Sequence, residues 1–204
     1  MGMHFKLGLY EHQSAGALEG LQKLIFDSKF TSNRKIEDIE NINVVAYEPA
    51  FGIIGDPAKK TPTTRQSADH SMVYIVGTIL RKAFESKEFN EKLGRFTSLD
   101  QVWKDLMLEP KDYGHKALFN PVTRTLMQKA TFTHGGKEYD SKYPEGIPTS
   151  ISITFKDGTK YDSGFVMFLQ DTQETLQPIC KIFSTIRIIY LGDYPSMRES
   201  WPLN

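Results

Sequence analysis

Five histidines, one cysteine and one lysine-containing loop are the parts of this sequence whose residue types could support chemistry. The histidines are His4, His12, His70, His115 and His134. They lack the close spacing of metal ligands, so no metal site is predicted. Cys180 has no histidine nearby in the sequence that would activate it as a nucleophile. The loop at 55–61 lacks the glycine that a phosphate-binding loop carries before its lysine. Common motifs therefore predict neither a metal nor a cofactor.

Composition argues against several classes of partner. The 204 residues include 25 basic and 25 acidic side chains, so the formal net charge is zero. A balanced charge argues against binding to nucleic acid or to an anionic membrane surface. The longest apolar stretch, 72–80, is far shorter than the ~20 residues that a membrane-spanning helix needs. One cysteine cannot form a disulfide within the chain, which favours a reducing, intracellular compartment.

The elements that would position these side chains begin with a helix over 13–27, where apolar residues recur with a period of 3.6. Gly16 and Gly20 lie on this helix and would let another backbone approach it closely. A second helix is expected over 67–84, with Ser67 or Asp69 at its start. Shorter helices are expected near 98–107 and 121–129.

Segments rich in β-branched and aromatic residues predict a small sheet. They are 41–47, 130–133, 149–155 and 161–168. Asp157-Gly158 is a typical hairpin turn between the last two segments. The sum of these elements is an α+β fold, with helices packed on one face of a small antiparallel or mixed sheet.

Two segments carry a resemblance to a known family. The first is 4–20, followed by the strand that ends at Tyr47. The second, 62–76, is more specific because it reads without a gap: Pro-Thr-Thr-Arg-Gln-Ser-Ala-Asp-His-Ser-Met-Val-Tyr-Ile-Val. Together with the strands in 149–168, they resemble the 2-methylcitrate dehydratase (MmgE/PrpD) family, which also contains cis-aconitate decarboxylase. The resemblance covers residues 4 to about 168.

The resemblance implies a lyase that removes water from small tricarboxylates in propionate breakdown, without a metal. Family enzymes have a helical domain and an α+β lid, and 1–168 resembles the lid. The helical domain, which supplies several acid–base residues, is absent, so this chain is expected to be inactive alone. The resemblance also implies a homodimer for the full-length enzyme. It places the enzyme in the mitochondrial matrix of a eukaryote or in the bacterial cytoplasm. The alternative is a non-catalytic module that associates with itself or with a full-length relative.

Tyr47 and His12 are the catalytic residues that the resemblance implies. Tyr47 matches a position where family members carry a functional tyrosine or histidine, and His12 lies near a family histidine. Each also has a structural interpretation. Tyr47 could be a half-buried sheet residue whose hydroxyl is in water. His12 could cap or pack against a helix.

Lys6, Arg65 and His70 are the substrate-binding residues that the resemblance implies. Lys6 and Arg65 would pair with substrate carboxylates, Arg65 through its two parallel donors. His70 would orient the substrate. Alternatively, the two cations are solvated surface charges, and His70 bonds the 61–65 loop and holds its helix.

The chain departs from the family at two places. Gly8 stands where some members have a catalytic histidine, which argues against decarboxylase chemistry. After Phe168 the family has a turn that contains Gly-His, whereas this chain continues differently. Codons permitted for 169–175, read two bases later, give Ser-Gly-His-Ala-Arg-Asn. We therefore expect 169–204, which includes Cys180, to be a non-homologous tail produced by a frameshift.

Overall fold

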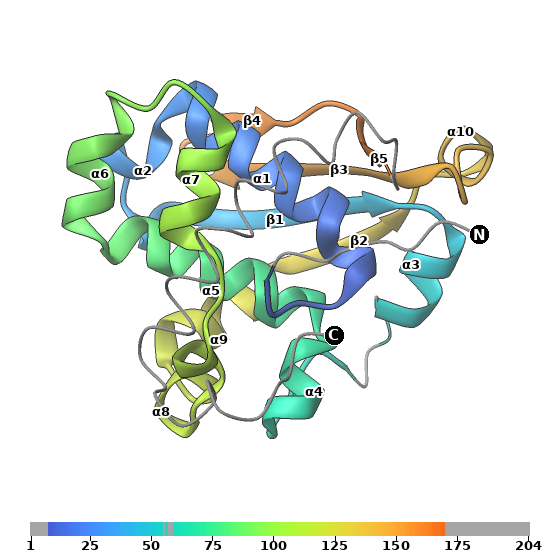
Figure 1. The fold of residues 1–204 in the computed structure, drawn as a ribbon, viewed down its shortest axis with the longest axis horizontal. Coiled ribbons are helices and arrows are strands. Elements are labelled where there is room, and N and C mark those ends of the chain that lie inside the picture. The colour runs from blue at the N-terminus through green and yellow to red at the C-terminus, as the bar shows by residue number, and fades with distance from the viewer. Residues whose placement is uncertain (1–7, 55, 57–58, 170–204) are drawn as a thin grey trace, which may run out of the picture. The chain divides into compact units, whose positions relative to one another are not determined.

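A computed structural model describes residues 8–54, 56 and 59–169 (Figure 1). The chain divides into two compact units, and the larger one spans Lys6–Phe168. The fold described below is that of this larger unit. The predictions made for Lys6 and for the tail after Leu169, including Cys180, lie outside the described residues.

A mixed sheet forms the centre of the described part of the chain. Its strands are β1 (Ile39–Ala46), β2 (Ala130–His134), β3 (Gly146–Phe155), β4 (Lys160–Asp162) and β5 (Val166–Leu169). They are arranged in the order β2-β1-β3-β4, and β5 also pairs with β3. β1 runs parallel to β2 and antiparallel to β3, so Val44 lies opposite both Phe132 and Ile151. The predicted strand at 41–47 is thus central.

Helices cover one face of this sheet, as Figure 1 shows. The longer ones are α1 (Ala15–Ser28), α5 (Met72–Glu85), α7 (Leu99–Leu106) and α9 (Pro121–Gln128). The shorter ones are α2 (Phe30–Asn33), α3 (Glu48–Ile54), α4 (Arg65–Asp69), α6 (Lys87–Leu93), α8 (His115–Leu118) and α10 (Lys137–Asp140). Three 3₁₀ turns among the described residues are η1 (His12–Ser14), η2 (Ile36–Asp38) and η4 (Pro110–Tyr113). The predicted α+β class is confirmed.

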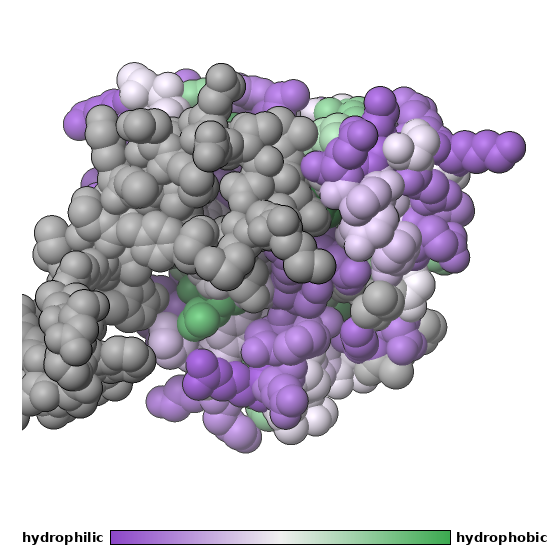
Figure 2. All heavy atoms as spheres, turned by 45° about the vertical axis from the view of Figure 1, so that its right-hand side comes forward, coloured by the Kyte–Doolittle hydropathy of each residue, from purple (hydrophilic) through white to green (hydrophobic). Residues whose placement is uncertain are grey.

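The burial of β1 shows which face of the sheet forms the core. Ile42 and Val44 are buried, whereas Asn41 and Asn43, which alternate with them, are half-exposed. On the buried face, α1 packs along β3 and also contacts α5 and α7. The coloured surface in Figure 2 is mostly hydrophilic, with small hydrophobic patches. Within the described residues, no helix has the length and apolar character needed to cross a membrane.

The predicted helix at 67–84 is wrong in one respect, because it is two helices. His70 and Ser71 leave the helical conformation between α4 and α5. Thr64 caps α4, accepting a hydrogen bond from the Ser67 backbone N–H at 3.1 Å. Ser71 caps α5, and its hydroxyl donates to the carbonyl of Lys59 at 2.6 Å. Two cap signals within a few residues favour a break, and the break places His70 at the junction.

The two glycines of α1 permit the close approach that the sequence predicts. A Cβ atom on Gly16 would lie 2.6 Å from the carbonyl oxygen of Ile147 and 2.5 Å from Oγ1 of Thr149. A Cβ atom on Gly20 would lie 2.9 Å from a methyl group of Ile151. All three distances are shorter than real Cβ contacts, so α1 depends on these glycines to lie against β3.

Gly16→Ala is expected to destabilise the fold by about 1–3 kcal/mol, since the methyl group meets backbone that cannot move easily. The gain in helix propensity offsets only part of this cost. Gly20→Ala should cost less, because its nearest neighbour is a side chain. Gly94→Ala is the control, since nothing lies within 4 Å of its added Cβ atom. Urea unfolding measures all three, and a Gly16→Ala variant as stable as wild type would contradict the packing.

Candidate functional site

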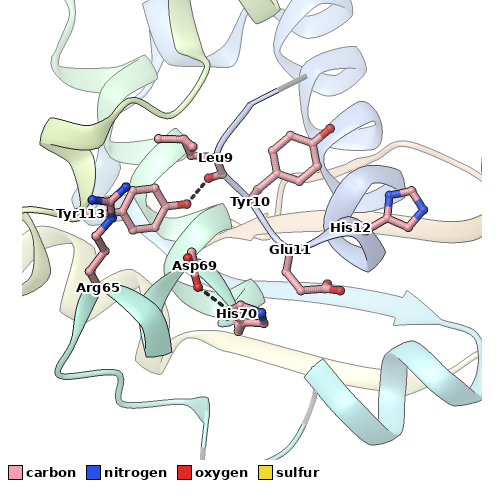
Figure 3. Close-up of a pocket in the computed structure, with 8 residues that line it drawn as sticks. All are labelled: Leu9, Tyr10, Glu11, His12, Arg65, Asp69, His70 and Tyr113. Carbon is pink, nitrogen blue, oxygen red and sulfur yellow. Dashed lines mark hydrogen bonds and ion pairs between the residues drawn. The ribbon is translucent and has the colours of Figure 1, made fainter. Parts of the chain in front are cut away.

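A cavity of about 320 Å³ opens between the segment before α1 and the helix α4 (Figure 3). Its lining residues are Leu9, Tyr10, Glu11, His12, Arg65, Asp69, His70 and Tyr113. Its volume is at the lower end of the range found for small-molecule sites, ~300–1,000 Å³. The two walls come from residues 9–12 and 65–70, which are distant in sequence, and Tyr113 completes the lining.

Buried tyrosines hold the N-terminal wall of the cavity. The Tyr113 hydroxyl donates a hydrogen bond to the carbonyl oxygen of Leu9. Burial raises the pKa of Tyr113, and the nearby Asp69 raises it further. Tyr10 packs edge-on against Trp103, with 5.6 Å between ring centroids, and burial raises the pKa of Tyr10 to about 12. Both hydroxyls are therefore neutral near pH 7.

The opposite wall is α4 and the loop that leads into it. Arg124 of α9 fixes this loop, because Nη2 donates to the carbonyl oxygen of Pro62 at 2.5 Å and Nε donates to that of Leu118 at 2.8 Å. Arg65 begins the helix directly after the cap residue Thr64. Its side chain is exposed, and the described residues provide no hydrogen bond or ion pair to its guanidinium. Arg65 is thus a cation at the cavity that can bind an anion.

His70 has one ring nitrogen engaged and one available. Nδ1 contacts the carboxylate of Asp69 and lies 3.1 Å from the carbonyl oxygen of Gln66. Both partners are acceptors, so Nδ1 carries the proton, and Nε2 has the lone pair when the ring is neutral. The His70 ring therefore hydrogen-bonds to residues of α4. The alternative that it bonds the 61–65 loop is wrong. Asp69 is the last residue of α4, where it orients His70.

Glu11 and Tyr47 carry buried oxygens without partners. Glu11 Oε2 and the Tyr47 hydroxyl are shielded from solvent, and neither has a hydrogen-bond partner among the described residues. Tyr47 is 0% exposed and stacks on Tyr143 with 4.7 Å between ring centroids. The pKa of Tyr47 is raised well above its usual range. Burial is the largest cause, and the nearby Tyr143 and Glu11 raise the pKa further. The interpretation of Tyr47 as half-buried with a wet hydroxyl is wrong.

The structure brings His12, Arg65 and His70 to one cavity. Tyr47 is not in the lining, and Lys6 lies outside the described residues. Sequence reasoning missed Glu11, which has no motif around it. It also missed Tyr113, whose long separation from Leu9 gives no local signal.

Comparison of the sequence with known families and proteins assigns neither a family nor a function. No family model matches the sequence. No curated protein matches it either. Among the described residues, no group of three or more His, Cys, Asp or Glu side chains could hold a metal ion.

Proposed function

We propose that this chain is the lid portion of a 2-methylcitrate dehydratase-like hydro-lyase, and that its cavity binds a small tricarboxylate. One observation supports the proposal above the others. The segments 4–20 and 62–76, which carry the resemblance, are distant in sequence, and both contribute residues to the same cavity. Chance similarity in two separate segments gives no reason for them to meet at one cavity.

The reaction proposed for the complete site is a dehydration. A base takes the proton from the carbon next to a carboxylate, and the electrons of that C–H bond form a C=C bond. The C–O bond breaks, and an acid protonates the departing hydroxyl, so that water leaves. Tyr47 and His12 are the proton-transfer residues in this proposal, because Tyr47 matches a functional position of the family and His12 lies near a family histidine.

Substrate binding in this proposal depends on Arg65, His70 and Lys6. The guanidinium of Arg65 can donate two parallel hydrogen bonds to one carboxylate. His70, once it gains a second proton, can donate from Nε2 to another carboxylate. The Asp69 carboxylate contacts the His70 ring, which offsets part of its negative charge when His70 is protonated. Lys6 would add a further cation.

Isothermal titration of the purified chain with citrate tests the proposal. We expect a dissociation constant within the range typical of enzyme substrates, about 1 µM to 1 mM. We expect no formation of an unsaturated tricarboxylate, since the family draws further acid–base residues from its helical domain. Butane-1,4-diol, which has no carboxylate, is the control and should not bind. If citrate does not bind at millimolar concentration, the proposal is wrong. Turnover by this chain would contradict only the expectation that it binds without reacting.

A further inference from the structure

Glu11 lines the cavity but has none of the roles described above. Its Oε2 atom is shielded from solvent and has no hydrogen-bond partner among the described residues. A buried carboxylate oxygen of this kind is costly, because it has lost water without gaining a donor. A donor on a bound ligand would remove that cost.

A second buried oxygen lies within electrostatic range of Glu11. The Tyr47 hydroxyl also has no hydrogen-bond partner among the described residues. The charge of Glu11 contributes to the raised pKa of Tyr47. The two groups are therefore an acceptor and a donor with unmet hydrogen bonds. Tyr47 is not in the cavity lining, so Glu11 is the group of the two that a ligand in the cavity meets. A hydroxyl group can donate to Glu11, whereas a carboxylate can only accept.

The positions of the lining residues indicate how a ligand would lie. In Figure 3, Arg65 and Tyr113 are on one side of the cavity, Glu11 is on the other, and Asp69 and His70 are between them. A ligand that places a carboxylate on Arg65 extends its other end toward Glu11. A second carboxylate there would meet a like charge, whereas a hydroxyl would find an acceptor.

We propose that Glu11 is a specificity residue that selects hydroxyl-bearing carboxylates: its carboxylate turns toward the ligand and accepts a hydrogen bond from the ligand's hydroxyl while Arg65 binds a carboxylate. The inference rests on the proposed function and assigns the hydroxyl end of the same site. It also separates the hydrated substrate of a dehydratase from its unsaturated product, because only the substrate carries the hydroxyl.

Two ligands that differ by one hydroxyl test the inference. Citrate and propane-1,2,3-tricarboxylate have the same carbon skeleton and the same three carboxylates, and only citrate has the hydroxyl. Titrations of the purified wild-type chain should show citrate binding about tenfold tighter, the effect of one hydrogen bond to a charged group. Glu11→Ala should bind the two ligands within about twofold of each other, and Glu11→Gln should retain most of the preference because its amide oxygen still accepts. Glu37→Ala, at an exposed position in η2, should keep the wild-type preference.

The ratio of the two affinities separates the failure of this inference from failure of the proposed function. If the wild-type chain binds neither tricarboxylate, the proposed function and the role of Glu11 are both wrong. If it binds both equally, or if Glu11→Ala keeps the full preference, only the role of Glu11 is wrong. Far-UV circular dichroism establishes that each variant is folded. Should Glu11→Ala not fold, the wild-type ratio and the Glu11→Gln ratio still decide the question.

Discussion

Replacing Arg65 by alanine is expected to weaken citrate binding by about 10- to 100-fold, the effect of hydrogen bonds between charged groups. The reason is that Arg65 is the arginine in the cavity lining, and the described residues offer its guanidinium no competing ion pair. Its fork of donors matches the two oxygens of a carboxylate. Because Arg65 begins α4 and is exposed, its removal should leave the fold intact.

Two further variants separate geometry from charge. Arg65→Lys keeps the charge but loses the paired donors, so its affinity should fall between those of wild type and Arg65→Ala. Arg95→Ala removes an equally exposed arginine that is not part of the cavity lining, and it should bind citrate as wild type does. Isothermal titration at one fixed ionic strength gives all four affinities. If Arg65→Ala binds citrate as tightly as wild type, Arg65 does not bind the carboxylate and the prediction is wrong.

The elements of the fold with strong local patterns could be predicted from the sequence. The period of 3.6 over 13–27 corresponds to α1, and the β-branched run at 41–47 corresponds to β1. The role of Gly16 and Gly20 could be predicted because glycine is unfavourable inside a helix. Its presence there indicates close packing, which in the structure is the packing of α1 on β3. The break between α4 and α5 was missed, since the apolar pattern continues through it while two capping residues, Thr64 and Ser71, decide the boundary.

The candidate site was only partly predictable, because its geometry depends on contacts distant in sequence. Arg65 and His70 lie in one segment and could be grouped from the sequence. The pairing of His70 with Asp69 requires knowing that α4 ends between them. The orphaned oxygen of Glu11 depends on how side chains from other segments exclude water from it. Burial of this kind leaves no mark on a single sequence.

The strongest structural support for the cavity wall comes from a buried ion pair beside Tyr113. Asp112 is 5% exposed, and its Oδ2 accepts hydrogen bonds from Lys82 Nζ and from the Glu109 backbone N–H, both at 2.9 Å. Lys82 also donates to the carbonyl oxygen of Met107 at 2.7 Å. The carbonyl of Asp112 accepts from the Tyr74 hydroxyl at 2.5 Å. This network fixes η4, and with it the tyrosine that bonds Leu9.

Asp112→Ala is expected to destabilise the protein by about 3–5 kcal/mol, because it leaves the partly buried Lys82 ammonium without its counter-charge. The double variant Lys82→Met/Asp112→Ala should be more stable than Asp112→Ala, since it removes the unpaired charge as well. Glu88→Ala breaks the exposed Glu88–Lys92 pair and serves as the control, with no measurable loss of stability expected. Urea unfolding gives these differences. If the network also positions Tyr113, Asp112→Ala weakens citrate binding under conditions where the variant is still folded. Equal stability of Asp112→Ala and wild type would mean that η4 is held by its apolar contacts alone.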